Sequence, residues 1–250
     1  MNKDLFLKSN DVKLILLICG DSKTGKKTIV KGIIKDNKFT EKEQTSFKSY
    51  FFTDEETVGK STILIPIELR VLNSDEIDSD LKSNKTFFSE ALGAFVVNSI
   101  TDNNSFTNGE KWKDKIDLMC CLPNRFPLPI FLLINKCDTI TNEDEKEENK
   151  NLQYLQKDKI ESYSLENQFF NTFLLGKGDD DNKISINNYN KEENIKDLIV
   201  SPSTPFKEMV KIILGFKDLR NTFIKQSGGT IDDSEFEHAN QNKSKKCNIY

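Results

Sequence analysis

Residues 20–28 of the chain have the sequence GDSKTGKKT and directly follow the apolar run Val12–Cys19. Gly20, Gly25 and Lys26 give the spacing G-x-x-x-x-G-K, which is typical of a loop that binds phosphate groups. Glycine lets backbone amides approach phosphate oxygens, and the N-terminus of a following helix favours negative charge. A lysine-rich turn before a helix would give the same pattern by chance, but its place after a buried strand favours a phosphate site. The predicted phosphate-binding residues are Gly20, Asp21, Ser22, Lys23, Thr24, Gly25, Lys26, Lys27 and Thr28.

Short apolar runs alternate along the chain with segments of helical spacing. This alternation predicts an α/β fold, with a mostly parallel central sheet and helices on both faces. Ligands of such sheets bind beyond the carboxyl ends of the strands. We expect strands at Val12–Cys19, Thr62–Leu72, Ala94–Ile100, Pro129–Asn135 and Asp197–Ser201, and helices at 26–36, 108–122 and 204–216.

A second motif, NKCD at residues 135–138, follows the apolar stretch PIFLLI. The carboxylate of Asp138 presents two acceptors side by side, and guanine offers two adjacent donors, its N1–H and its exocyclic amine. Adenine has no matching pair, so the carboxylate would select guanine. The stem of Lys136 can cover the face of the base, and Asn135 can tie this loop to the phosphate loop. The two motifs together predict a site for guanine nucleotide.

These motifs resemble those of Rab-type small GTPases of the Ras superfamily. The resemblance covers residues 12–35 and 87–138 well, Thr57–Asn73 poorly and the C-terminal third hardly at all. The motifs GAFVV, KWK and LPN are similar to the Rab branch of lysosome-related organelles. The resemblance implies a P-loop G domain over residues 1–225 that binds GTP or GDP. It also implies trafficking effectors and exchange factors as partners, and a role in vesicle and membrane trafficking.

The chain departs from the Rab pattern where magnesium and the third phosphate would bind. Lys27 stands where the family has a metal-binding Ser or Thr, and an ammonium has no lone pair to give to Mg²⁺. By resemblance, Thr57 in TVG would be a switch residue. Asn73 and Glu76 replace the Asp and Gly of the second switch, and no catalytic glutamine is evident. Magnesium binding is therefore doubtful, with Thr28 and Thr57 as the remaining candidate ligands, and hydrolysis is expected to be weak.

The last part of the chain is polar. Residues 139–196, rich in Asn, Lys, Glu and Asp, predict a polar insertion that has a helical part near Tyr154–Phe173. By resemblance, Ser201 would complete the guanine site. In the predicted flexible tail, 226–250, Cys247 lies fourth from the end after three lysines, which fits a lipidation site. The alternative is an unmodified polar tail.

The bulk properties limit the function further. A net charge of −4 gives no general attraction to nucleic acid, and no nucleic-acid partner is expected. The first apolar run is too short to cross a bilayer, and the N-terminus lacks the features of a signal peptide. We therefore expect a cytoplasmic protein that can attach peripherally to an endomembrane. A pseudo-GTPase scaffold that binds partners without nucleotide turnover remains the alternative, and a P-loop kinase is disfavoured by NKCD.

Overall fold

The computed structural model describes residues 13–35, 37–44, 47–58, 61–72, 85–120, 122, 127–139, 157–176, 198–216, 219–221 and 223. Within these residues one sheet of eight strands has the order β2-β3-β4-β1-β5-β6-β7-β8. All pairings are parallel except β2 with β3 and β3 with β4. The strands are β1 (Leu14–Cys19), β2 (Thr40–Glu43), β3 (Phe47–Val58), β4 (Ser61–Leu72), β5 (Gly93–Ser99), β6 (Ile130–Asn135), β7 (Asn171–Leu175) and β8 (Ile199–Val200).

The central strands form the core because they are apolar along their whole length. Every residue of β1, β5 and β7 is buried, as are the first five residues of β6. Strands that are covered on both faces have continuous apolar sequences of this kind. The predicted α/β fold is therefore confirmed.

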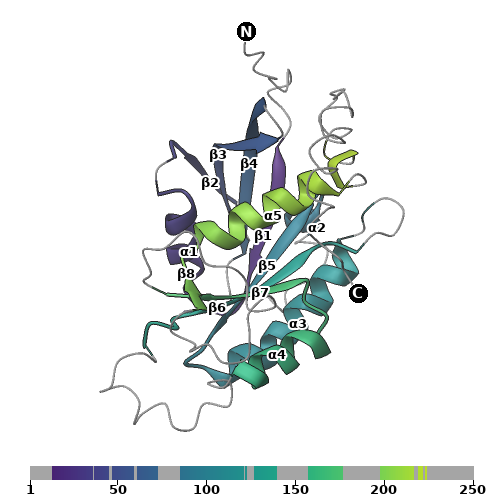
Figure 1. Ribbon diagram of the computed structural model, residues 1–250. Coiled ribbons are helices and arrows are strands. Elements are labelled where there is room, and N and C mark those ends of the chain that lie inside the picture. The colour runs from purple at the N-terminus through teal and green to yellow at the C-terminus, as the bar shows by residue number, and fades with distance from the viewer. Residues whose placement is uncertain are drawn as a thin grey trace, which may run out of the picture.

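Helices cover both faces of the sheet (Figure 1). They are α1 (Lys26–Ile33), α2 (Lys85–Phe88), α3 (Asn103–Met119), α4 (Lys157–Glu166) and α5 (Ser203–Gly215). On β5, a Cβ added to Gly93 would meet Met209 of α5, whereas Asn98 lies against Gly109 of α3. Residues an odd number of positions apart on a strand face opposite sides of the sheet. Hence α5 lies on one face, where it contacts α1, and α3 lies on the other with α2 and α4.

Two parts of the sheet differ from the sequence-based expectation. The region before Gly59 shows no clear pattern in sequence, yet residues 47–58 form β3, paired with β4 along its whole length. Within the predicted polar insertion at 139–196, α4 lies in the segment near Tyr154–Phe173 where a helix is expected, but the buried strand β7 is not expected there. Strand β7 has only five residues and lies between polar segments, so its apolar pattern is too short to stand out.

The helices that the structure describes include none long and apolar enough to cross a membrane.

Candidate nucleotide-binding site

The two predicted loops meet at the carboxyl edge of the sheet. Residues 20–25 follow β1 and the NKCD loop follows β6, and both strands run parallel to β5, which lies between them. The side-chain amide of Asn135 donates a hydrogen bond to the backbone carbonyl of Thr24 at 2.8 Å. This bond joins the predicted phosphate-binding motif to the predicted base-binding motif across 111 positions of sequence.

The phosphate loop is held in its shape by its own side chains. Lys26 Nζ donates to the carbonyl oxygens of Gly20 and Asp21, at 2.6 Å each. The hydroxyl of the buried Thr24 donates to the carbonyl of Asp21 at 2.9 Å. Gly25 has φ +93°, a left-handed conformation that glycine adopts without strain. The ammonium of Lys26 is thereby fixed against the loop at the N-terminus of α1, where anions bind favourably.

The base-binding loop is a tight turn. Lys136 has φ +64°, and its carbonyl accepts hydrogen bonds from the backbone N–H and the hydroxyl of Thr139. The backbone N–H of Cys137 donates to the carbonyl of Leu175 in β7 at 2.9 Å, which anchors the loop to the sheet. Burial raises the pKa of the Cys137 thiol above its ordinary range, so this cysteine packs as an apolar residue and is no nucleophile. Asp138 beside it is only partly buried.

Gly176, which follows β7, is a residue of the site that sequence reasoning missed. A Cβ at this position would lie 3.0 Å from the backbone nitrogen of Asp138 and 3.1 Å from its Cβ. Ser201, the predicted guanine contact, follows β8, one strand further from the NKCD loop, and its hydroxyl pairs with that of Ser203 at 2.6 Å. Gly176, directly after β7, therefore lies between the NKCD loop after β6 and Ser201 after β8. A lone glycine after an unrecognised strand gave no signal in the sequence.

The predicted switch and metal role of Thr57 is wrong. In the β3–β4 hairpin Thr57 pairs with Thr62, at the start of β4, whereas the carboxyl end of β4 at Val71 pairs with β1 near the phosphate loop. With a rise of about 3.3 Å per residue, Thr57 lies roughly 30 Å from that edge. A metal ligand from this part of the chain would have to precede Phe47, where β3 begins.

The remaining predicted site residues are either exposed on α1 or outside the described residues. Lys27 and Thr28 are exposed in the first turn of α1. Asn73, Glu76 and Cys247 lie outside the described residues.

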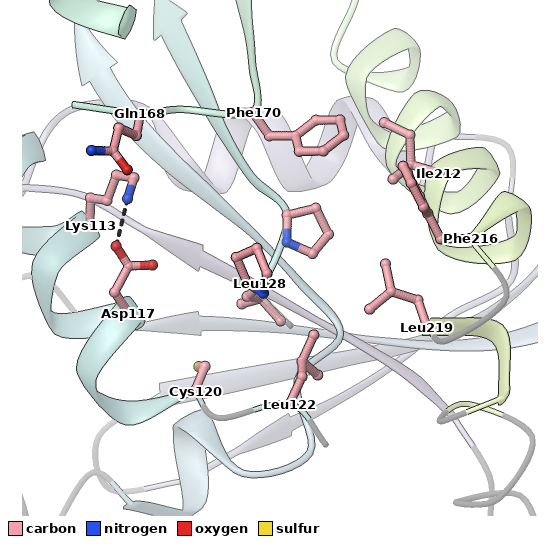
Figure 2. A pocket seen from close by; sticks show the side chains of 12 residues that line it. Lys113, Asp117, Cys120, Leu122, Leu128, Gln168, Phe170, Ile212, Phe216 and Leu219 are labelled. Atoms are coloured by element: carbon pink, nitrogen blue, oxygen red, sulfur yellow. Dashed lines mark hydrogen bonds and ion pairs between the residues drawn. The ribbon is translucent and has the colours of Figure 1, made fainter. Parts of the chain in front are cut away.

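A separate pocket lies at the other end of the sheet, and Figure 2 shows side chains that line it. It has a volume of about 630 Å³ and lies among the last residues of α3, the approach to β6 and the end of α5. Its apolar side chains include Leu128, Phe170 and Phe216, and the ion pair of Lys113 with Asp117 stands at one side. Since β6 carries NKCD at its opposite end, this pocket is distinct from the candidate nucleotide site.

Comparison with known proteins defines the class. The sequence model of the Ras family matches residues 13–172, which is more than half of the chain. Mouse (Mus musculus) Rab-32 is 37% identical over 92 residues, covering 32% of this chain and 41% of that protein. Human (Homo sapiens) Rab-7L1 is 27% identical over 143 residues, covering 52% of this chain and 62% of that protein. Rab-32A of Dictyostelium discoideum is 27% identical over 143 residues, covering 52% of this chain and 58% of that protein.

The fold and the two joined loops define a small G domain, and the chain belongs to the Ras family. The relatives that match within that family are Rab proteins, as the motifs of the sequence predict. The similarity to Rab-32 agrees with the branch suggested by GAFVV and KWK. The chain spans between 41% and 62% of the length of these relatives.

Replacing Gly25 with alanine should separate the two loops. The new Cβ would lie 2.2 Å from Asn135 Nδ2, and the left-handed backbone disfavours a side chain. We expect a loss of about 1–3 kcal/mol in the free energy of unfolding, measured in urea, because strain is added and the Asn135–Thr24 bond is displaced. Gly215→Ala is the control, since nothing lies within 4 Å of its Cβ. Equal effects at the two glycines would contradict the prediction.

Proposed function

We propose that this chain binds GTP and GDP and acts as a Rab-like small GTPase in intracellular vesicle and membrane trafficking, with weak hydrolysis. The observation that carries the proposal is the hydrogen bond from Asn135 to the carbonyl of Thr24. It brings the predicted phosphate loop and the NKCD loop together, as the binding of one guanine nucleotide by both loops requires. The base of the nucleotide would bind at the NKCD loop, and its phosphates would bind at the loop before α1.

The base half of the site has the donor and acceptor pattern for guanine. Asp138 would accept from the N1–H and the exocyclic amine, and both bonds are charge-assisted. Lys136 would cover one face of the ring with its stem. Ser201 remains a predicted contact, and Gly176 would let the ring approach the backbone beside Asp138.

The phosphate half lacks the residues that hydrolysis in this family uses. Lys26 and the N-terminus of α1 would hold the phosphates. Lys27, Asn73 and Glu76 stand where the family binds magnesium and senses the third phosphate. Positioning and electrostatic stabilisation supply nearly all of the catalysis in phosphoryl transfer, so their loss would slow turnover strongly. The same departures support a second candidate, a pseudo-GTPase scaffold that binds partners without nucleotide turnover.

The nucleotide that co-purifies with the chain tests the proposal. We expect GDP or GTP in the denatured supernatant, identified by chromatography, and single-turnover hydrolysis slower than in an ordinary Rab. Adenine nucleotide, or no binding of added guanine nucleotide at micromolar concentration, would reject the guanine site. Rapid hydrolysis would reject the pseudo-GTPase.

The ammonium of Lys27 offers a substitute for the metal, with its exposed position in the first turn of α1 next to Lys26. A built-in cation near the phosphates would make binding independent of Mg²⁺. We expect GDP affinity to change less than about twofold on addition of EDTA, and Lys27→Thr to make affinity fall at least about tenfold under the same treatment. Lys31→Thr, one turn later and also exposed, is the matched control. A wild-type chain that loses nucleotide with EDTA would overturn this part of the proposal.

Membrane attachment would come through the tail. A lipid on Cys247 with Lys243, Lys245 and Lys246 before it gives reversible binding to an anionic membrane. The partners would then be trafficking effectors and exchange factors that meet the chain on the cytoplasmic side of an endomembrane. The mass of the C-terminal peptide from the native protein decides whether the lipid is present.

A further inference from the structure

The phosphate loop contains a carboxylate whose charge opposes the ligand. Asp21 directly follows Gly20, and its carbonyl accepts a hydrogen bond from Lys26 Nζ. A carboxylate at this position would repel the phosphates of a nucleotide and compete with them for the backbone amides of the loop. For the loop to bind phosphate well, the side chain of Asp21 has to point elsewhere.

Two side chains of α3 hold the carboxylate of Asp21. Asn108 Nδ2 donates to one carboxylate oxygen of Asp21 at 2.7 Å, and Trp112 Nε1 donates to the other at 3.2 Å. Asn108 and Trp112 are four residues apart, so they lie on the same face of the helix. Both oxygens of the carboxylate are thereby engaged by donors from a helix that is 87 or more positions away in sequence.

The two donors are themselves fixed. Trp112 is fully buried, so its indole cannot turn away, and an indole can only donate. Asn108 Oδ1 accepts a hydrogen bond from Lys111 Nζ at 3.2 Å, so both the oxygen and the NH₂ group of this amide have partners. The arrangement presents a rigid pair of donors to a carboxylate on a neighbouring loop.

We propose that Asn108 and Trp112 are positioning residues that hold the Asp21 carboxylate against α3. They keep its charge away from the phosphates and set the conformation of the phosphate loop. The inference rests on the proposed function, because it concerns the same nucleotide site. It predicts that α3, which supplies no residue to the two motifs, controls nucleotide affinity through Asp21.

A double-mutant cycle tests whether α3 affects nucleotide affinity through Asp21. We expect Asn108→Ala to lower the affinity for GDP about tenfold, because the carboxylate is released toward the phosphates. In an Asp21→Ala background the same replacement should change the affinity less than about twofold, since no carboxylate is left to hold. Asn104→Ala, exposed and one turn earlier on α3, is the control and should have no effect. An equal loss in both backgrounds, or no loss in either, would overturn the proposal.

Trp112 supplies a second readout that needs no nucleotide. It is the chain's single tryptophan, so the tryptophan fluorescence of the nucleotide-stripped protein reports on the surroundings of this one indole, which include the hydrogen bond to Asp21. Asp21→Ala should change the emission of Trp112, whereas Asn104→Ala should not. Unchanged emission in Asp21→Ala would overturn the proposal that Trp112 holds Asp21. A changed emission in a chain that binds no guanine nucleotide would support that contact and reject the proposed function.

Discussion

Replacing Asp138 with asparagine should lower the affinity for GDP by about a hundred- to a thousandfold. The reason is the loss of two charge-assisted hydrogen bonds, each worth about 1.5–3 kcal/mol, partly offset by the amide that replaces the carboxylate. An asparagine amide presents one acceptor and one donor, which fits the N1–H and the 2-oxo group of xanthine. The affinity for xanthosine diphosphate should therefore rise in the same variant. Fluorescent analogues of the two nucleotides measure both changes.

The matched control for this variant is Asp158→Asn, an exposed carboxylate in the first turn of α4. It should leave both affinities unchanged. If Asp138→Asn retained its preference for guanine, the NKCD loop would not be the base site. If the affinities for both bases fell together, Asp138 would act by holding the loop and not by reading the base.

A second large effect is expected at a buried ion pair on β4. Glu68 Oε1 accepts from Arg70 Nε and from Ser49 Oγ, each at 2.8 Å, and both charged side chains are buried. Arg70 Nη1 also donates to the carbonyls of Thr86, Phe87 and Ser89 around α2. Removing one member of a buried pair leaves the other charge without compensation, which costs about 3–5 kcal/mol. Glu68→Ala should lower the free energy of unfolding by that amount.

Urea unfolding at a fixed nucleotide concentration measures the loss, because bound ligand adds its own stability. Glu41→Ala is the comparison, since Glu41 pairs with Lys48 at a similar 2.9 Å but is exposed. An exposed pair of this kind is screened by solvent and contributes much less to stability than a buried one. Similar losses in the two variants would show that the pair around Arg70 is not the structural link between β4 and α2.

The central strands could be predicted, and the antiparallel hairpin could not, for a physical reason. Strands β1 and β6 are apolar throughout, because both faces of the sheet are covered, and such runs stand out in any sequence. The second half of β3 has the sequence TDEETV, which looks like a solvated loop. It forms a strand because it pairs with β4 residue by residue. That pairing depends on β4, which comes later in the chain, so the local sequence of β3 does not indicate that it forms a strand.

The same limit explains the error at Thr57. The sequence TVG resembles a switch motif, but three residues say nothing about which end of the sheet they occupy. The pairing of Thr57 with Thr62 and of Val58 with Ser61 places these two residues at the closed end of the β3–β4 hairpin, far from the phosphate loop. Motif identity is a local property, whereas distance to a site is a property of strand pairing.

The amino-acid sequence alone determined the chemistry of the site: the glycine spacing around Lys26, the carboxylate of Asp138, and the ammonium of Lys27 in place of a hydroxyl. These properties belong to single residues and short spacings, so they are visible without a fold. Only the tertiary structure decided that Asn135 bonds Thr24, that Trp112 holds Asp21 and that Gly176 lies against Asp138. Such contacts join distant segments because the order of the strands brings their ends together, and that order follows from the packing of the whole sheet.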